Sequence, residues 1–373
     1  MLRIARVTSA LYPDVIGGHA IHSMELSSLQ AKAGHSVSVI TCKRKKQPEY
    51  ERMFNFEVFR LKRVTMPWDL FGLDNPVLPS LASTIAQLRP DIVDAQSHLF
   101  WTTYAAVKAA NKIQVPVITT VHGIIAERRF AVNAAQWAYI YTFGMAALRD
   151  STVVVCLSKS DMQQVGNLGI PLERIRVVPL GVRTDLFHPS SQPSKSSILW
   201  AGRFVREKGL EDLVLAAGLV KKLRPDLKFI LVGDGPEKSM IVSKIRHLNL
   251  TDTVSTVGSE SQEFVADQLR KCLCLVLPSR REGLPRILLE TMSCGKPIIA
   301  SDLPSIREMT AGAAILVPPN SPEALSKAIL RIAETDWLRR ELGNAGLERV
   351  KEKYAWEVVL PKLEELYNQV LEA

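Results

Sequence analysis

The chain lacks the features that mark membrane-spanning, fibrous and disulfide-stabilised proteins. No apolar run approaches the roughly 20 residues that a transmembrane helix needs, and glycine and proline form no tract. Arg3 and Arg6 interrupt the apolar N-terminal stretch, where a secretory signal would keep a continuous hydrophobic block. The five cysteines are an odd number in mostly apolar surroundings, which favours reduced structural thiols. We therefore expect a folded protein in the cytoplasm.

Signatures of metal sites and of common cofactor sites are also missing. Asp-x-Asp does not occur, the seven histidines form no cluster with metal-ligand spacing, and Cys272-x-Cys274 is not a zinc spacing. The glycine patterns of Walker loops and dinucleotide-binding turns are absent as well. Aromatic residues make up 6% of the chain and no basic stripe is interleaved with them, which argues against nucleic acid as a partner. We expect no metal and no resident cofactor.

Positive charge is abundant and unevenly distributed. The net charge is +9, with 21 Lys/Arg against 14 Asp/Glu in residues 1–190 and 26 against 24 in the remainder. The excess includes basic clusters at 43–46, 60–63 and 128–129. Such an excess attracts phosphorylated ligands or an anionic membrane surface, although it can also serve solubility alone.

Short apolar runs alternate with helix-length segments along the whole chain. These runs, rich in valine and isoleucine, lie at 2–7, 37–41, 91–95, 117–121, 152–157, 175–178, 198–201, 228–232, 272–277, 297–300 and 314–317. This alternation is typical of parallel strands buried on both faces. The polar, Pro/Ser-rich segment 188–197 indicates a linker. We therefore predict an α/β fold of two doubly wound, Rossmann-like domains, 1–187 and 198–354, facing each other across a cleft, with a C-terminal helix in 355–373 that can cross back to the first domain.

The strongest local signal follows the run at 272–277. Glu282 ends a strand-to-helix loop, Pro285 suits the first helical position, and Glu290 lies in an otherwise apolar helix, where a carboxylate needs partners. A spacing of eight residues corresponds to about 12 Å along a helix, wider than the carboxylate pair of a glycosidase. The glutamates therefore fit two ends of one elongated ligand, and the helix N-terminus between them offers N–H groups to a diphosphate. Taken alone, both could be surface charges.

A second motif, Gly202-Arg203-Phe-Val-Arg206-Glu-Lys208-Gly209, also connects a strand to a helix. Arg203 offers a planar fork of N–H donors and Lys208 a point charge, a combination that suits two phosphates. Taken alone, such cations could equally be solvated charges at a helix start.

Together these motifs resemble those of the retaining glycosyltransferases of family four, which have the GT-B fold. The shared features are Glu282-x7-Glu290, Gly202-Arg203…Lys208-Gly209, Val178-Pro-Leu-Gly181-Val182…Phe187-x-Pro189, Gly233-Asp-Gly-Pro236, the early Gly17-Gly18 loop and His122-Gly123. The resemblance implies transfer of a hexose-type sugar from a UDP- or GDP-sugar to a hydroxyl acceptor, with retention at the anomeric carbon and without a metal. It also implies that the first domain binds the acceptor and the second the nucleotide-sugar.

The resemblance further implies a role for each motif residue. Glu290 corresponds to the residue that binds the ribose hydroxyls, and Glu282 to the one that faces the sugar hydroxyls beside the reacting carbon. Arg203 and Lys208 correspond to the pair that neutralises the diphosphate leaving group. The main catalytic task would be to stabilise the charge that develops on that group.

The remaining donor contacts would come from loops and a helix start. Leu284 and Arg286 flank the start of the helix that carries Glu290, where Arg286 can help to bind phosphate. Gly17 and Gly18 would let the first loop approach the diphosphate closely, which a Cβ would obstruct; an ordinary turn is the alternative. His122 would face the donor sugar across the cleft, unless it is a histidine with a purely structural role at a strand end. The segment Gly233–Pro236 is expected to be a tight structural turn.

Two stretches depart from the family pattern. Many members have Gly-Phe-Gly after the first glutamate, where this chain has Gly283-Leu-Pro-Arg286. A Gly-Gly pair that often precedes Glu308 is Pro304-Ser305 here. Pro285 thus removes one backbone N–H donor from the donor loop, and Arg286 adds a charge.

The acceptor is expected on the first domain. Its basic excess and the apolar, aromatic segment 66–73 favour a lipid-linked glycan or another cell-envelope precursor, and peripheral association with the inner face of the plasma membrane. The same segment could equally pack in the core. Two other functions fit the fold: an epimerase or phosphorylase, and a non-catalytic partner subunit, against which the intact glutamates and cations of the two motifs argue.

Overall fold

The computed structural model describes all residues except 16, 45–46, 65–74, 124–136, 191–195 and 373. They form two compact units, one of Met1–Leu180 with Val359–Ala373 and one of Gly181–Val358. Residues 181–187, expected to end the first domain, thus belong to the second unit, and residues 359–373 of the last helix belong to the first. Half of the expected linker, residues 191–195, lies outside the described residues.

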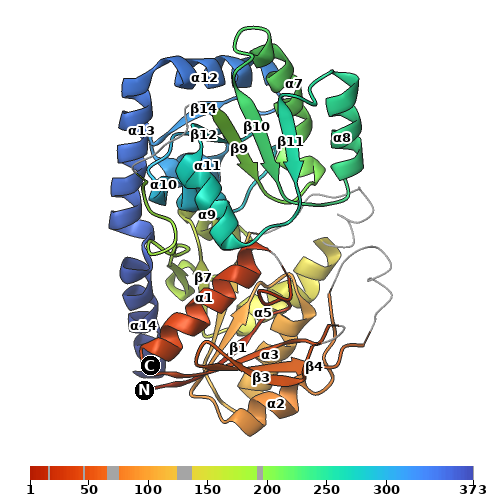
Figure 1. Cartoon of the computed structure of the whole chain (residues 1–373). Coiled ribbons are helices and arrows are strands. Elements are labelled where there is room, and N and C mark those ends of the chain that lie inside the picture. Colours follow the sequence, from red (N-terminus) through yellow and green to blue (C-terminus); the bar gives the residue numbers. More distant parts are fainter. Residues whose placement is uncertain (16, 45–46, 65–74, 124–136, 191–195, 373) are drawn as a thin grey trace. The chain divides into compact units, whose positions relative to one another are not determined.

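The first unit is built on one sheet with the strand order β3-β4-β2-β1-β5-β6-β7-β8 (Figure 1). Its pairs are parallel except for β3 with β4, among the residues that are described. The strands are β1 (Arg3–Val7), β2 (Ser36–Cys42), β3 (Tyr50–Met53), β4 (Phe56–Leu61), β5 (Ile92–Gln96), β6 (Val117–Val121), β7 (Val153–Cys156) and β8 (Ile175–Val177).

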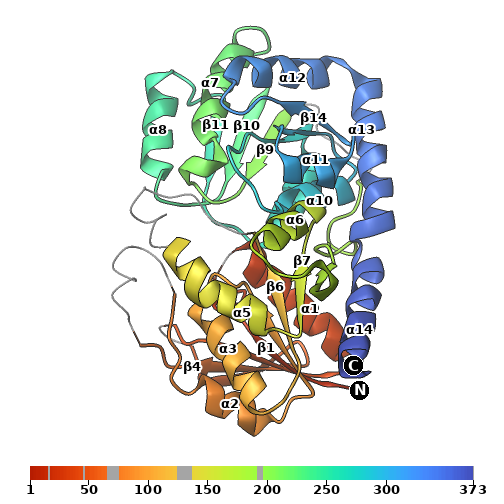
Figure 2. The same ribbon diagram turned by 180° about the vertical axis from the view of Figure 1, so that it is seen from behind.

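Helices cover both faces of this sheet. Figure 1 shows α1 (Gly18–Lys32) on one face, and the reverse view in Figure 2 shows α2 (Leu81–Leu88), α3 (Trp101–Lys112) and α5 (Met145–Asp150) on the other. A further helix, α6 (Lys159–Asn167), connects β7 to β8. Because helices cover both faces, β5, β6 and β7 are buried along their whole length.

The second unit is built on a parallel sheet with the order β11-β10-β9-β12-β13-β14. Its strands are β9 (Ser197–Ala201), β10 (Lys228–Val232), β11 (Val254–Val257), β12 (Cys274–Leu277), β13 (Ile298–Ser301) and β14 (Ala314–Val317). Its helices are α7 (Leu210–Lys221), α8 (Lys238–His247), α9 (Gln262–Lys271), α10 (Arg286–Ser293), α11 (Pro304–Thr310), α12 (Pro322–Glu334) and α13 (Asp336–Arg349). The prediction of two doubly wound α/β domains is confirmed.

In both sheets the order in which the chain adds strands reverses at one point. In the second unit the chain runs outward from β9 through β10 to β11 and returns to β12 on the other side of β9, and in the first unit β1 and β5 flank the equivalent point. Open α/β sheets bind ligands at the carboxyl ends of the strands that flank such a switch point. The loops after β9, β12, β1 and β5 are therefore where each unit is expected to bind a ligand.

The last helix, α14 (Trp356–Glu372), begins in the second unit and ends in the first. Within the second unit Trp356 packs against Gly181 so closely that a Cβ at Gly181 would lie 2.2 Å from the indole ring. Within the first unit Tyr367 is buried, and Glu364 lies 3.4 Å from His35. No helix of the described residues combines the length and apolar character needed to cross a bilayer.

Most expected elements form, and three strands were missed. The expected runs correspond to eleven of the strands. The strands β3, β4 and β11 had no counterpart in the sequence analysis. The strands β3 and β11 are edge strands of their sheets, and β4, which lies between β3 and β2, alternates between buried and half-buried residues instead of forming a continuous apolar run.

Candidate active site

The two motifs of the second unit follow adjacent strands. The Gly202–Gly209 segment leaves β9 and the segment with Glu282 leaves β12, and these strands pair in parallel through Ile198–Cys274 and Leu199–Leu275. The fold therefore brings both motifs to the switch point of this sheet.

The turn after β9 is held by the 233–236 segment. The Phe204 backbone N–H donates to the Asp234 carbonyl oxygen over 2.8 Å. Gly233 has φ +138°, and a Cβ there would lie 1.9 Å from the Gly202 carbonyl oxygen. The segment thus packs tightly against the turn after β9, and its own chain turns at Pro236 and Glu237. The turn leaves the side chain of Arg203 exposed to solvent.

Lys208 and Glu282 form an ion pair between the two motifs. The Lys208 Nζ lies 2.7 Å from Glu282 Oε1, which also accepts a hydrogen bond of 2.6 Å from Ser279 Oγ. The side chain of Glu282 is 7% exposed and that of Lys208 is 24% exposed. The backbones approach closely as well, because Gly209 has φ +63° and a Cβ there would lie 2.0 Å from the Pro278 carbonyl oxygen. The Lys208–Glu282 ion pair is therefore held in place by its surroundings and partly shielded from solvent.

The helix α10 begins at Arg286, one residue later than predicted. Pro285 precedes the helix with ψ 103°, an extended value, so it is the N-cap and not the first helical residue. The segment from Glu282 to Pro285 is therefore not helical, and the helical spacing expected between the two glutamates does not apply. Leu284 lies half-buried in this loop.

Glu290 is buried in α10, as its apolar neighbours in the sequence predict, and Arg286 is its ionic partner. The Arg286 Nε lies 3.6 Å from Glu290 Oε1, and both side chains are less than 10% exposed. Arg286 Nη1 also donates to the Gly181 carbonyl oxygen over 3.4 Å. Arg286 thus neutralises Glu290 in this structure, a contact that the sequence analysis did not foresee.

In the first unit, the N-terminus of α1 follows the loop after β1. Gly17 is the N-cap in extended conformation, the helix has no side-chain cap and no acidic residue in its first turn, and a Cβ at Gly17 meets no described atom within 4 Å. Gly18 is exposed. His19 Nε2 is buried with no hydrogen-bond partner in the described part of the chain. Burial, assisted by the charge of Arg44, lowers the pKa of His19 to about 4.

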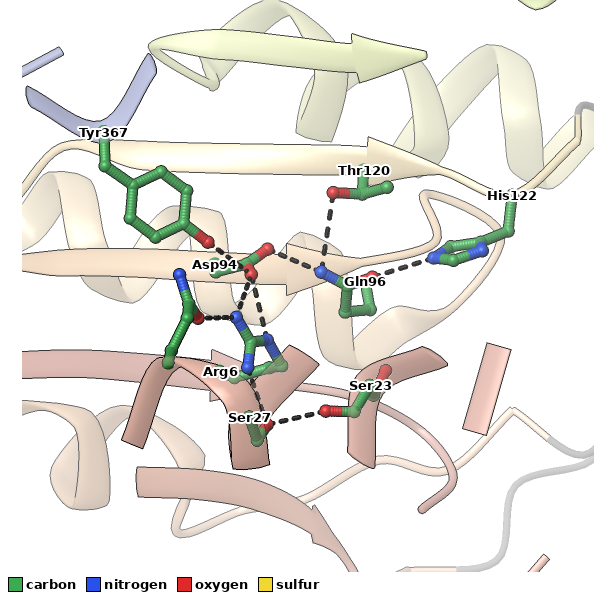
Figure 3. A network of polar contacts seen from close by, with 9 residues as sticks. Arg6, Ser23, Ser27, Asp94, Gln96, Thr120, His122 and Tyr367 are labelled. Atoms are coloured by element: carbon green, nitrogen blue, oxygen red, sulfur yellow. Dashed lines mark hydrogen bonds and ion pairs between the residues drawn. The ribbon is translucent and has the colours of Figure 1, made fainter. Parts of the chain in front are cut away.

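A buried ion pair lies between β1 and β5. Arg6 and Asp94 face each other in register on the two paired strands, and Arg6 Nε and Nη2 each lie 2.9 Å from Asp94 Oδ2 (Figure 3). Arg6 also donates to Ser27 Oγ and Gln30 Oε1, each over 2.6 Å. The Tyr367 hydroxyl of α14 donates to Asp94 Oδ2 over 2.7 Å. Burial opposes the charge of Arg6, but the ion pair outweighs it and raises the pKa of Arg6.

The same network reaches His122. Gln96 Nε2 donates to Asp94 Oδ1 over 2.6 Å, and Gln96 Oε1 lies 2.8 Å from His122 Nε2 (Figure 3). The His122 ring also contacts His19 and His22, at centroid distances of 6.1 and 5.4 Å. His122 therefore lies directly after β6, beside two histidines of α1, and has Gln96 as a hydrogen-bond partner.

Sequence reasoning missed Gln96, Asp94 and His19. Gln96 is the last residue of β5, and His122 follows the last residue of the neighbouring β6. A polar residue at the carboxyl end of a buried strand is the signal that could have identified Gln96.

The basic excess of the first unit is partly used inside the protein. Arg60 is 2% exposed and contacts Asp14 over 2.7 Å and Glu51 over 2.5 Å, and Arg6 is fully buried. These two cations are not available at the surface. Residues 45–46, 66–73 and 128–129, on which part of the membrane prediction depends, lie outside the described residues.

The cysteines behave as expected. All five are buried and none forms a disulfide, and burial raises the pKa of Cys272 and Cys294 to about 12. They are structural thiols. Within the described ranges, no group of three or more His, Cys, Asp or Glu side chains is placed to hold a metal ion.

Two family models together match nearly the whole chain. The model described as Glycosyltransferase Family 4 matches residues 16–186, and the model described as Glycosyl transferases group 1 matches residues 183–349. An uncharacterised glycosyltransferase of Methanocaldococcus jannaschii is 30% identical over 263 residues, which is 70% of each chain. A glycogen synthase of Mycobacterium tuberculosis is 23% identical over 395 residues, covering 98% of this chain and 94% of the relative.

Solved structures share the fold. The sucrose-phosphate synthase of Thermosynechococcus elongatus superposes with a TM-score of 0.83 at 22% identity, covering all of both chains. Anabaena HepE, solved in complex with UDP and glucose, has a TM-score of 0.78 at 16% identity and covers 99% of this chain and 100% of its own. These structures confirm the GT-B fold predicted from the sequence.

Proposed function

The chain belongs to the glycosyltransferases of group 1 and family 4, with the GT-B fold, and we propose that it uses a UDP- or GDP-sugar as its donor. It would transfer a hexose-type sugar to a hydroxyl acceptor, with retention at the anomeric carbon and without a metal. The observation that carries this proposal is the Lys208–Glu282 pair at the switch point of the second unit.

The pair suits the chemistry of a diphosphate leaving group. A lysine that is 24% exposed keeps one side of its ammonium group accessible while Glu282 holds the other. The exposed Arg203 side chain belongs to the same pair of loops, and the start of α10 supplies backbone N–H groups. Two cations and a helix N-terminus are the groups that lower the energy of charge developing on a diphosphate. Arg203 and Lys208 would therefore act on the leaving group.

Glu282 and Glu290 would bind the donor's hydroxyl groups. Glu282 is held by Lys208 and by Ser279 and would face the sugar, whereas Glu290 would accept hydrogen bonds from the ribose. Arg286 lies 3.6 Å from the Glu290 carboxylate, so it would help to orient Glu290, beside any contact with phosphate. Leu284 would pack against the donor at the start of α10.

Gly17, Gly18 and His122 would contribute from the first unit. The α1 N-terminus has no capping side chain, and nothing in the described chain requires glycine at position 17. An anion at this helix start would satisfy the free N–H groups. We assign Gly17 and Gly18 to the diphosphate and His122 to the donor sugar.

Thermal unfolding with nucleotides tests the donor. We would measure the unfolding temperature with UDP, GDP, ADP and CMP and their common sugars, with and without EDTA. A ligand at 100 times its dissociation constant stabilises by about 2.7 kcal/mol. One nucleoside diphosphate should raise the unfolding temperature, EDTA should not change this, and Glu290→Ala should abolish it. No shift with any nucleotide would favour a non-catalytic partner subunit.

A transfer assay with matched variants tests the leaving-group role. Lys208→Ala should abolish transfer while leaving the protein folded. Lys221→Ala is the control, because Lys221 forms a comparable ion pair with Asp252, over 2.6 Å, at the surface of the same unit. Near-full activity of Lys208→Ala would refute the assignment. Interconversion of the donor without any acceptor would instead identify an epimerase.

The acceptor would dock on the first unit. We propose a lipid-linked glycan or another cell-envelope precursor, and a protein of the cytoplasm that associates peripherally with the inner face of the plasma membrane. The support is the basic excess of residues 1–190, reduced by the buried Arg6 and Arg60. If the purified protein fails to sediment with phosphatidylglycerol vesicles at low salt, the membrane association is refuted.

A further inference from the structure

We propose that Gln96 is a positioning residue that holds His122 in the tautomer with its proton on Nε2, and that the Asp94 carboxylate sets the orientation of the Gln96 amide. The proposal rests on the proposed function, in which His122 contacts the donor sugar. It rests on three contacts of Figure 3: Arg6 with Asp94 and Asp94 with Gln96, which are buried, and Gln96 with His122, which is partly buried.

The Asp94 carboxylate is anchored on one side by the charge of Arg6. Arg6, which is fully buried, donates from Nε to Oδ2 and has its Nη2 2.9 Å from the same oxygen, to which the Tyr367 hydroxyl also donates. A guanidinium group in a protein is always charged, and its buried charge is compensated by an ionised carboxylate. An ionised carboxylate only accepts hydrogen bonds. Asp94 Oδ1 can therefore face a donor and no second acceptor.

That requirement fixes the orientation of the Gln96 amide. The atom of Gln96 that lies 2.6 Å from Asp94 Oδ1 must be the NH2 nitrogen, because the amide oxygen at this distance would face a carboxylate oxygen. The same nitrogen lies 3.4 Å from Thr120 Oγ1, which can also accept. The amide oxygen must then point the other way, toward His122.

The orientation of the amide in turn fixes the histidine. Gln96 Oε1 is an acceptor 2.8 Å from His122 Nε2, so that this ring nitrogen must carry a proton. In the neutral ring Nδ1 then carries the lone pair. A ligand group that contacts Nδ1 must be a hydrogen-bond donor, such as a sugar hydroxyl. The network thus determines both the orientation of the ring and the kind of group that it recognises.

Nitrogen NMR of the full-length protein tests the tautomer directly and needs no substrate. The protein would carry 15N in its seven histidine rings, and the His122 signals would be identified by their loss in His122→Asn. In the wild type, Nε2 should have the shift of a protonated ring nitrogen and Nδ1 that of an unprotonated one. In Gln96→Leu the two shifts should move toward each other as both tautomers become populated. A protonated Nδ1 in the wild type, or unchanged shifts in Gln96→Leu, would overturn the proposal.

Measurements of kcat distinguish a positioning role of Gln96 from general damage to the buried hydrogen-bond network. Gln96→Leu should lower kcat about tenfold, the rate equivalent of one hydrogen bond, and should have no further effect in the His122→Asn background. The matched control is Gln30→Leu, because Gln30 is equally buried and bonds Arg6 at the other end of the network. Gln30→Leu should leave kcat unchanged.

The outcomes distinguish this proposal from the proposed function. Equal losses of kcat in Gln96→Leu and Gln30→Leu would show a structural role only and would overturn the positioning role. If the wild type transfers no sugar from any nucleotide donor, the proposed function fails, while the NMR measurement still decides whether Gln96 sets the tautomer of His122.

Discussion

Removing one hydroxyl group from α14 should weaken the first unit by a defined amount. In Tyr367→Phe the ring keeps its volume, so that no cavity forms and only the 2.7 Å hydrogen bond to Asp94 is lost. Hydrogen bonds to charged groups contribute about 1.5–3 kcal/mol. The lower end applies here, because Asp94 Oδ2 keeps both N–H groups of Arg6. We expect a loss of about 1.5 kcal/mol, or roughly 3–6 °C in the unfolding temperature of a unit of this size.

Hydrogen exchange of the native protein, followed by mass spectrometry, is the suitable assay because the two units can unfold separately. A loss of about 1.5 kcal/mol accelerates exchange through global opening of the unit roughly tenfold. Peptides that cover β1, β5 and the end of α14 should therefore exchange faster in Tyr367→Phe. Peptides that cover β9 and β10 should not change, because Tyr367 belongs to the first unit.

The control variant removes the same chemical group at the surface. Tyr50 is 52% exposed and its hydroxyl donates to Glu57 Oε1 over 2.9 Å, so Tyr50→Phe also deletes a bond from a phenol to a carboxylate. Solvent replaces that bond, so Tyr50→Phe should leave hydrogen exchange close to that of the wild type. Equal effects of the two variants, or unchanged exchange in Tyr367→Phe, would refute the reasoning that the buried network anchors α14.

Three further predictions concern backbone contacts and pH. Gly209→Ala should destabilise the second unit by about 2–4 kcal/mol and weaken donor binding, since the new Cβ would lie 2.0 Å from the Pro278 carbonyl oxygen at a positive φ; urea unfolding and nucleotide titration check this. Gly181→Ala should lower the free energy of unfolding by about 1–3 kcal/mol, because the new Cβ would clash with Trp356. An unfolding temperature equal to that of the wild type would contradict this prediction. Burial lowers the pKa of His98 to about 4. Below pH 6.5 this histidine therefore binds a proton in the unfolded chain but not in the folded chain. Stability should therefore fall by about 3 kcal/mol between pH 6.5 and 4 on account of this residue, and urea titrations of His98→Leu at a series of pH values should show a shallower decline.

Local sequence signals were sufficient for the elements that are buried on both faces. A central parallel strand needs apolar residues at every position, as β6 has in Val117–Val121, and such a run is visible without knowledge of its neighbours. The edge strand β3 and its neighbour β4 form an antiparallel pair with a turn at Phe54 and Asn55, both at positive φ, and their residues alternate in burial. These two segments become strands because they pair with neighbouring strands, and the amino-acid composition of the segments does not show which strands those are.

The motif residues of the second unit were identified, but their contacts were not. The sequence placed Lys208 and Glu282 in two loops 74 residues apart, and only the strand order brings those loops together at the switch point. Arg286 and Glu290, which form an ion pair, are four residues apart on one helix. The one-residue error in the helix start did not conceal this pair. A partner for the Glu290 carboxylate was expected, but Arg286 was assigned to phosphate and was not considered as that partner.

The buried Arg6–Asp94 pair shows how a charge inside an apolar run can be used to predict a site. Arg6 was taken only as an argument against a secretory signal, although an arginine in a strand buried on both faces must have an ionic partner nearby. Asp94 occupies the corresponding position of another apolar run. Placing β1 beside β5, as the doubly wound order requires, pairs the two residues directly. Gln96 follows two residues later on the same strand face. The network that reaches His122 was therefore accessible from the strand order, whereas Tyr367, 273 residues from Asp94 in the sequence, becomes its partner only through the return of α14.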